Sequence, residues 1–158
     1  MRSKKTTIYR TSSSEETKRL GEVFSEGFLK EAPGDKGASV VVLSGELGAG
    51  KTTFVQGFLH GLGVRRRVPS PTFVIMRRYV ARAARKHVFH MDAYRLKDAS
   101  HLSVLGFDEL LEDPRNIVLI EWGERIKDAI PRGAVWIKFG YGKKEGLRNV
   151  SITEGGRT

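Results

Sequence analysis

The chain has 158 residues, of which 39% are hydrophobic and 29% are charged, and it carries a formal net charge of +10 with no cysteine. This length suits a single domain that buries roughly 70% of its unfolded-chain surface, and the missing cysteine excludes disulfides, thiol catalysis and thiolate metal sites. No apolar run approaches the ~20 residues of a membrane span, and no apolar signal core follows the basic N-terminus. We therefore expect a cytoplasmic protein without a secretion signal.

The first part of the chain is predicted to contain an edge strand at residues 6–11 and a helix at residues 14–31. Serines at positions 12–14, followed three residues on by Glu15 and Glu16, form a capping box, and apolar residues continue at helical spacing. A turn is expected at residues 33–37, then a buried strand at 39–43 and a helix at 51–62. Two prolines exclude regular structure at residues 65–71, where we predict a basic loop.

The second part is predicted to alternate strands with short helices. Strands are expected at residues 72–80, 87–91 and 116–121, short helices at 98–105, 108–112 and 124–129, and a closing hairpin at 134–139 and 148–153. Residues 81–86 resemble the tip of a hairpin, although a helix is an alternative there. We predict one α/β domain over residues 1–154, with a P-loop NTPase-like, mostly parallel central sheet, antiparallel hairpins and flanking helices. Residues 155–158 are expected to be a disordered tail.

The most informative stretch joins the strand at residues 39–43 to the helix that follows. Gly45, Gly50, Lys51 and Thr52 fit the G-x-x-x-x-G-K-[ST] pattern of a phosphate-binding loop. Glycines let backbone N–H groups turn toward phosphate oxygens, and the following helix presents its positive end to the same anion. Lys51 can reach the β- and γ-phosphates, and the Thr52 hydroxyl can bind Mg²⁺. We expect the Lys51 side chain to be exposed while the site is empty.

Two carboxylates follow apolar runs that read as strands. Asp92 ends the first run and Glu121 the second. Ligands of open α/β sheets bind at the carboxyl ends of the strands, so both side chains are candidates for metal binding or catalysis. A solvated strand terminus would give the same pattern.

The positive charge is concentrated in the middle of the chain. No acidic residue lies between Glu46 and Asp92, whereas the basic residues there are Lys51, Arg65, Arg66, Arg67, Arg77, Arg78, Arg82, Arg85 and Lys86. Such a block suggests a polyanionic partner, with RNA the first candidate. A solvated surface that serves solubility is the alternative.

Four segments together resemble one family. They are Gly45–Thr53 around the phosphate loop, Ser-Pro-Thr-Phe at residues 70–73, Asp-Ala-Tyr-Arg-Leu at residues 92–96 with His90 before it, and Glu121-Trp122. In this order and spacing they are similar to the TsaE (YjeE-type) family, the small ATPase of bacterial tRNA threonylcarbamoyladenosine synthesis.

The resemblance implies ATP or ADP binding with Mg²⁺ and a cycle of ATP hydrolysis that resets a complex with the TsaB and TsaD proteins, which modify tRNA. It implies that Thr52 and Glu121 hold the metal, that Asp92 and Lys51 serve turnover, and that Thr72 lies in a switch-like loop near the γ-phosphate. The implied nucleotide contacts are Ser14 beside the adenine, then Gly48, Ala49, Gly50, Lys51, Thr52, Thr53, Trp122 and Arg148.

Several assignments stay open at this point. His90 can be a general base or a strand histidine hydrogen-bonded near the site, and the second interpretation is favoured. Tyr94 and Trp122 can stack on a base or pack in the core, and Arg95 can act as an arginine finger or pair with a local acid. Two other functions also fit a P-loop scaffold: a small-molecule kinase, for which no acceptor site is evident, and an RNA-binding module whose nucleotide site is structural.

Overall fold

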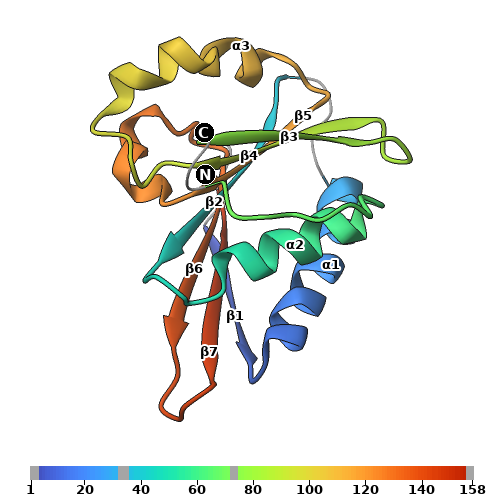
Figure 1. Ribbon diagram of the computed structural model, residues 1–158, viewed down its shortest axis with the longest axis vertical. Coiled ribbons are helices and arrows are strands. Elements are labelled where there is room, and N and C mark those ends of the chain that lie inside the picture. The colour runs from blue at the N-terminus through green and yellow to red at the C-terminus, as the bar shows by residue number, and fades with distance from the viewer. Residues whose placement is uncertain (1–3, 32–35, 72–74, 156–158) are drawn as a thin grey trace.

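The computed structural model describes residues 4–31, 36–71 and 75–155. Within these residues, seven strands form one sheet in the order β1-β7-β6-β2-β5-β4-β3 (Figure 1). The strands are β1 Lys5–Thr11, β2 Ser39–Gly45, β3 Met76–Ala81, β4 Lys86–Asp92, β5 Asn116–Glu121, β6 Val135–Tyr141 and β7 Arg148–Glu154. The helices are α1 Ser14–Glu31, α2 Lys51–Gly61 and α3 Phe107–Glu112, with 3₁₀ helices η1 Ala99–Leu105 and η2 Gly123–Ala129.

The centre of the sheet is parallel and its two sides are antiparallel. Strand β2 runs parallel to β5 and β6, and β5 runs parallel to β4. The hairpins β3–β4 and β6–β7, together with β1 on β7, add antiparallel strands outside this core. All six residues of β5 are buried, as expected of a parallel strand covered on both faces. The predicted mixed α/β fold is confirmed.

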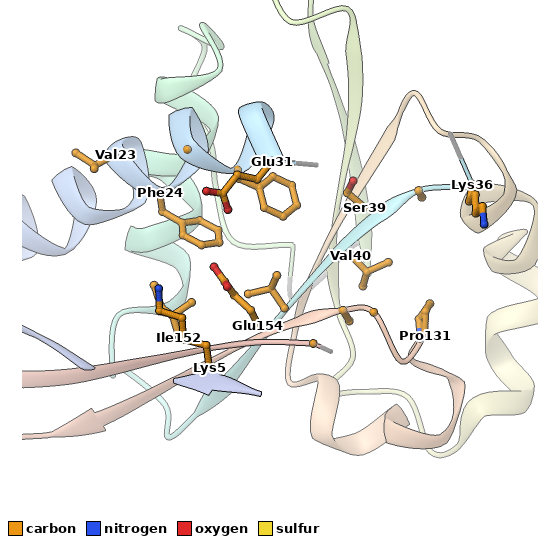
Figure 2. A pocket seen from close by; sticks show the side chains of 18 of the residues that line it. Lys5, Val23, Phe24, Glu31, Lys36, Ser39, Val40, Pro131, Ile152 and Glu154 are labelled. Carbon is orange, nitrogen blue, oxygen red and sulfur yellow. The ribbon is translucent and has the colours of Figure 1, made fainter. Parts of the chain in front are cut away.

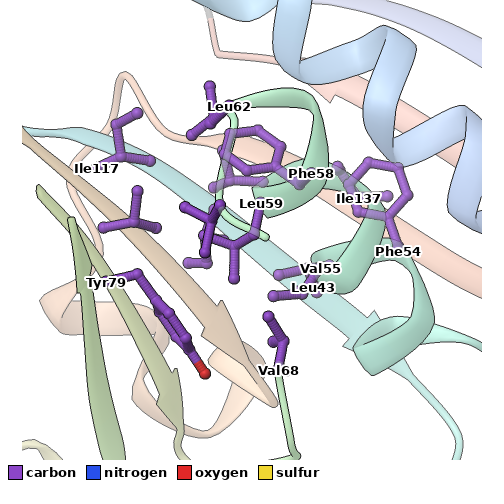
Figure 3. Packing of buried hydrophobic residues seen from close by; sticks show 14 of the residues in the cluster. Leu43, Phe54, Val55, Phe58, Leu59, Leu62, Val68, Tyr79, Ile117 and Ile137 are labelled. Carbon is purple, nitrogen blue, oxygen red and sulfur yellow. The ribbon is translucent and has the colours of Figure 1, made fainter. Parts of the chain in front are cut away.

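Helices cover both faces of the sheet, with α1 and α2 on one side and η1, α3 and η2 on the other (Figure 1). The apolar side of α2 packs on the sheet, where Phe54, Phe58 and Leu59 are at most 1% exposed and meet residues of β2, β5 and β6 (Figure 3). Helix α1 then packs on α2 at very short range, since a Cβ at Gly57 would collide with the carbonyl oxygen of Lys18. Packing on the sheet on one side and on α1 on the other therefore fixes the position of α2.

Most predicted elements are confirmed, and the deviations are local. The capping box forms: Glu16 N donates to Ser13 Oγ at 3.1 Å, and Ser12 N donates to Glu16 Oε2 at 2.6 Å. Residues 82–85 form the hairpin turn, not a helix. Two of the predicted short helices are 3₁₀ segments, and the backbone of η2 leaves helical geometry at Ile126, because such short runs propagate few helical hydrogen bonds.

Strand β3 begins at Met76, later than predicted; Thr72, Phe73 and Val74 lie outside the described residues, as do positions 156–158 of the predicted tail. No helix in the described ranges combines the length and apolar character needed to cross a bilayer.

Candidate functional site

The glycine-rich loop leaves the carboxyl end of β2 and enters α2 directly. Gly45, Gly48 and Gly50 all have positive φ angles, of 132°, 75° and 108°, a region that glycine adopts without a steric cost. At Gly45 an added Cβ would also collide with the Phe139 carbonyl oxygen of the neighbouring strand β6. The first glycine of the motif is therefore required both by the turn and by packing on the sheet.

Lys51 begins α2 and points back into the loop. Its Nζ atom donates to the carbonyl oxygens of Gly45 at 2.5 Å and Glu46 at 2.8 Å, and it lies 4.2 Å from the centre of the Trp122 ring. The residue is 5% exposed, so the expectation of an exposed lysine is wrong: loop carbonyls and an indole ring enclose the ammonium group. Burial lowers the pKa of Lys51, while Glu121, Glu124 and Asp92 act in the opposite direction.

The two candidate carboxylates are neighbours across the sheet. Asp92 ends β4 and is paired in register with Glu121, which ends β5 and is paired in turn with Leu43 of β2. The Thr52 hydroxyl donates to Glu121 Oε1 at 2.9 Å, and Tyr94 N donates to Asp92 Oδ1 at 2.9 Å. Asp92 is 4% exposed and Glu121 is 3% exposed, so neither is a solvated strand terminus.

A cavity of about 170 Å³ lies over these strand ends. Its lining residues are Leu47, Gly48, Gly50, Lys51, Thr52, Thr53, Ser70, Asp92, Glu121 and Trp122. The volume is below the roughly 300–1,000 Å³ typical of pockets that enclose a whole small molecule. The enclosed part of the site is therefore sized for a small group or for one end of a larger ligand.

Not all predicted site residues reach this cavity. Ala49 is buried within the loop, and Ser14 is an exposed residue at the start of α1; neither lines the cavity. The guanidinium of Arg148 lies 4.5 Å from the centre of the Tyr141 ring, and the Tyr141 hydroxyl donates to the Leu47 carbonyl at 2.7 Å. Arg148 therefore contacts Tyr141, which in turn contacts the phosphate loop, and it does not line the cavity. Thr72 lies outside the described residues.

The oxygen ligands in the cavity suit a magnesium ion that shares its coordination with phosphate. The described residues contain no group of three or more histidine, aspartate or glutamate side chains able to hold a metal ion alone. Mg²⁺, however, is commonly bound through one or two protein oxygens, with waters and phosphate oxygens completing the octahedron. The Thr52 hydroxyl and the Glu121 carboxylate, in direct contact, fit that pattern.

Two residues outside the cavity support the site, and the sequence predicts only the first of them. His90 is fully buried, and its Nε2 atom lies 2.5 Å from Glu121 Oε2, which agrees with the favoured interpretation of a hydrogen-bonded strand histidine. The second is Tyr141, which no local sequence pattern marks, since only the folded hairpin brings it to Leu47. Trp122 lines the cavity and also packs on Tyr94, with ring centres 5.0 Å apart, whereas Arg95 is not among the lining residues.

A second cavity is much larger and has a different character. It measures about 860 Å³ and lies between α1 and the starting residues of β2, with Phe24, Val40 and Ile152 on its walls and Glu31 and Glu154 nearby (Figure 2). The phosphate loop is at the other end of β2. The larger cavity therefore contains none of the predicted site residues.

In this site a strand leads through a glycine-rich turn into a helix that begins with lysine and threonine, and two carboxylates end adjacent parallel strands. This arrangement defines a single-domain α/β protein of the P-loop type. The family model described as "Threonylcarbamoyl adenosine biosynthesis protein TsaE" matches residues 11–150. The chain therefore belongs to the TsaE family.

Individual relatives agree with this assignment. The tRNA threonylcarbamoyladenosine biosynthesis protein TsaE of Bacillus subtilis is 41% identical over 124 residues, which cover 78% of this chain and 71% of that protein. The protein of the same name from Haemophilus influenzae is 34% identical over 134 residues, which cover 85% and 80%. The crystal structure of YdiB from Bacillus subtilis matches with a TM-score of 0.76 and 31% identity, covering 99% of this chain and 90% of that one.

Proposed function

We propose that this protein binds ATP or ADP with Mg²⁺ and hydrolyses ATP as an accessory protein of tRNA N6-threonylcarbamoyladenosine modification. The proposal rests on one observation above all: three segments that lie far apart in the sequence, Lys51-Thr52, Asp92 and Glu121, line a single small cavity. The pathway is that in which the similar proteins of Bacillus subtilis and Haemophilus influenzae are named. Since that pathway acts on tRNA, we infer a cytoplasmic place of action.

The loop and Lys51 bind the phosphates in this proposal. Backbone N–H groups of residues 48–53 surround the anion. The Lys51 ammonium gives up its hydrogen bonds to the two loop carbonyls and donates to phosphate oxygens instead. Thr52 and Glu121 would hold Mg²⁺, which neutralises charge on the β- and γ-phosphate oxygens when it is bound. Ser14 and Arg148 would contact the nucleotide outside the enclosed cavity, and Trp122 would close the site beside Lys51.

Asp92 is assigned to turnover. One of its carboxylate oxygens is held by Tyr94 N, so the side chain has a defined orientation at the cavity wall. From there it can orient a water molecule and accept a proton from it, as a general base does. Thr72, in the segment between Ser70 and β3, would sense the γ-phosphate.

TsaB and TsaD are the proposed protein partners, with tRNA contacted directly or through their complex. The test measures ATP turnover by this protein alone, with small acceptor molecules, and with TsaB, TsaD and tRNA together. We expect slow turnover alone and faster turnover with the partners. Transfer of phosphate to a small acceptor would identify a kinase instead, and RNA binding without turnover in any mixture would indicate a structural nucleotide site.

A further inference from the structure

His90 contacts one of the proposed metal ligands from inside the protein core. Strands β4 and β5 pair in parallel, with His90 opposite Leu119 and Asp92 opposite Glu121. Side chains alternate along a strand, so His90 and Glu121 lie on the same face, diagonally across the two strands. His90 is 0% exposed and therefore reaches Glu121 from beneath the cavity, and it does not line the cavity itself.

Both oxygens of the Glu121 carboxylate are occupied by protein groups. Oε2 is 2.5 Å from His90 Nε2, and Oε1 accepts the Thr52 hydroxyl at 2.9 Å. A buried carboxylate needs such partners, because its loss of hydration is otherwise costly. With one oxygen held on each side, the carboxylate cannot rotate without breaking a hydrogen bond.

The two ring nitrogens of His90 have different surroundings. Nε2 faces a carboxylate, which accepts hydrogen bonds, whereas Nδ1 is buried and has no hydrogen-bond partner among the described residues. A hydrogen on Nδ1 would be a buried donor without an acceptor, which proteins avoid. The hydrogen therefore belongs on Nε2, where it is donated to Glu121, and the bare Nδ1 faces the core.

We propose that His90 is a positioning residue: by donating from Nε2 to Glu121 Oε2, it keeps Oε1 directed at Thr52, where the two oxygens form the protein side of the magnesium site. This inference deepens the proposed function and depends on it for its binding test. Partners that orient a metal ligand change metal affinity by about 10–100-fold when they are removed. The influence of His90 should therefore appear in Mg²⁺-dependent nucleotide binding.

Two amide variants separate this role from simple core packing. In His90→Gln the amide nitrogen can take the place of Nε2 and still donate to Glu121. In His90→Asn the same amide is one methylene shorter and cannot reach. Both variants place a polar group in the same buried position, so they carry similar costs of folding. His87→Asn is the matched control, because His87 belongs to the same strand and contacts Arg78 at 2.8 Å, outside the cavity.

The experiment titrates a fluorescent ADP analogue with Mg²⁺ and with a chelator, after thermal unfolding has shown that each variant is folded. His90→Asn should reduce the affinity gain due to Mg²⁺ about tenfold and leave metal-free affinity nearly unchanged. His90→Gln should retain most of the gain, and His87→Asn all of it. An equal gain in the Asn and Gln variants, or an equal loss with and without Mg²⁺, would overturn the proposal.

A second measurement does not require nucleotide. Long-range ¹H–¹⁵N spectra of the imidazole rings distinguish a hydrogen on Nε2 from one on Nδ1. We expect the Nε2–H form for His90 in the unliganded protein, and a change in its signal in Glu121→Ala. A hydrogen on Nδ1 would overturn the positioning role even if nucleotide binds normally. If the parent protein binds no nucleotide yet shows the Nε2–H form, the proposed function fails while the hydrogen bond stands.

Discussion

The two cavities of this molecule differ in size and in chemistry, and the larger one is not the candidate site. The cavity beside α1 has a volume of about 860 Å³ and mainly apolar walls, while the cavity at the phosphate loop has about 170 Å³. The smaller one nevertheless brings together an ammonium, a hydroxyl and two carboxylates, and its three charged residues are at most 5% exposed.

The smaller cavity is the candidate site because buried charges converge there, and not because of its volume. Removing Lys51, Asp92 or Glu121 from water carries a cost, and the protein offsets part of it through the hydrogen bonds that fix these groups. The charged residues that line the large cavity, Lys5, Glu31, Lys36 and Glu154, are exposed and carry no such cost. Changes in the small cavity should therefore alter binding and turnover, whereas changes in the large cavity should alter stability alone.

The largest effect is expected for Lys51→Ala. The substitution removes the one ammonium among the residues that line the small cavity, so nucleotide affinity should fall by at least about a hundredfold, about 2.7 kcal/mol. Titration with labelled ADP measures it. Lys36→Ala, at the large cavity, is the control and should bind normally. Unchanged affinity in the Lys51 variant would remove the loop from nucleotide binding.

Asp92→Asn should stop ATP turnover and keep nucleotide affinity within roughly tenfold, about 1.4 kcal/mol. Asparagine keeps the shape of the side chain and can still accept from Tyr94 N, but it cannot take a proton. Single-turnover phosphate release in the presence of the partner proteins measures the effect. Asp128→Asn, an exposed change on η2, provides the control, and a normal rate in Asp92→Asn would exclude the residue from the mechanism.

Glu121→Ala should weaken nucleotide binding at least about tenfold, about 1.4 kcal/mol, when Mg²⁺ is present, and much less when a chelator is present. The reason is that Glu121 is proposed to act through the metal, beside Thr52. Paired titrations with and without Mg²⁺ measure the difference. Equal losses in both conditions would make Glu121 a structural residue of the strand end.

Two glycine substitutions test the large cavity and the helix packing beside it. At Gly27, which lines the large cavity, an added Cβ meets nothing within 4 Å, so Gly27→Ala should stabilise α1 by roughly 0.5–1 kcal/mol. At Gly57 the added Cβ collides with the Lys18 backbone, so Gly57→Ala should destabilise by about 1–3 kcal/mol. Denaturant unfolding measures both. A change in nucleotide affinity in Gly27→Ala would contradict the separation of the two cavities.

Local sequence patterns predict much of this fold because the pattern and the tertiary environment agree. Strand β5 is apolar from Ile117 to Ile120 and is buried throughout, and the serines before α1 form the predicted cap. The burial of Lys51 could not be predicted, because the loop carbonyls and the Trp122 ring that enclose it are brought together by folding. The same holds for Tyr141, whose contact with Leu47 spans 94 residues of sequence.

The smallest effect on nucleotide binding is expected in the basic loop at residues 65–67, outside both cavities. All three arginines are exposed. Arg66 lies 4.7 Å from the centre of the Tyr79 ring, and Arg65 donates to the His60 carbonyl at 3.3 Å, which is a long hydrogen bond. Because the Arg66 side of this cation–π contact is exposed, the contact contributes about 0.5–1 kcal/mol. Changing all three arginines to serine should therefore cost little stability and leave nucleotide affinity nearly unchanged.

Changing the three arginines to serine should instead weaken the association of the protein with a polyanion or an acidic partner. The loop connects α2 to the segment that contains Thr72, which is proposed to sense the γ-phosphate, so we expect the loop to respond when that phosphate is gained or lost. The triple variant should bind tRNA or the TsaB–TsaD complex more weakly. The slope of the logarithm of the binding constant against the logarithm of the salt concentration should also become flatter, by about one unit for each lost phosphate contact. The control replaces Lys127, Arg132 and Lys138 with serine, because these exposed residues lie on η2, in the turn that follows it and on β6, and it removes the same charge. If both triple variants lose the same amount of binding, net charge alone acts; if neither loses any, the arginines are only a solvated surface.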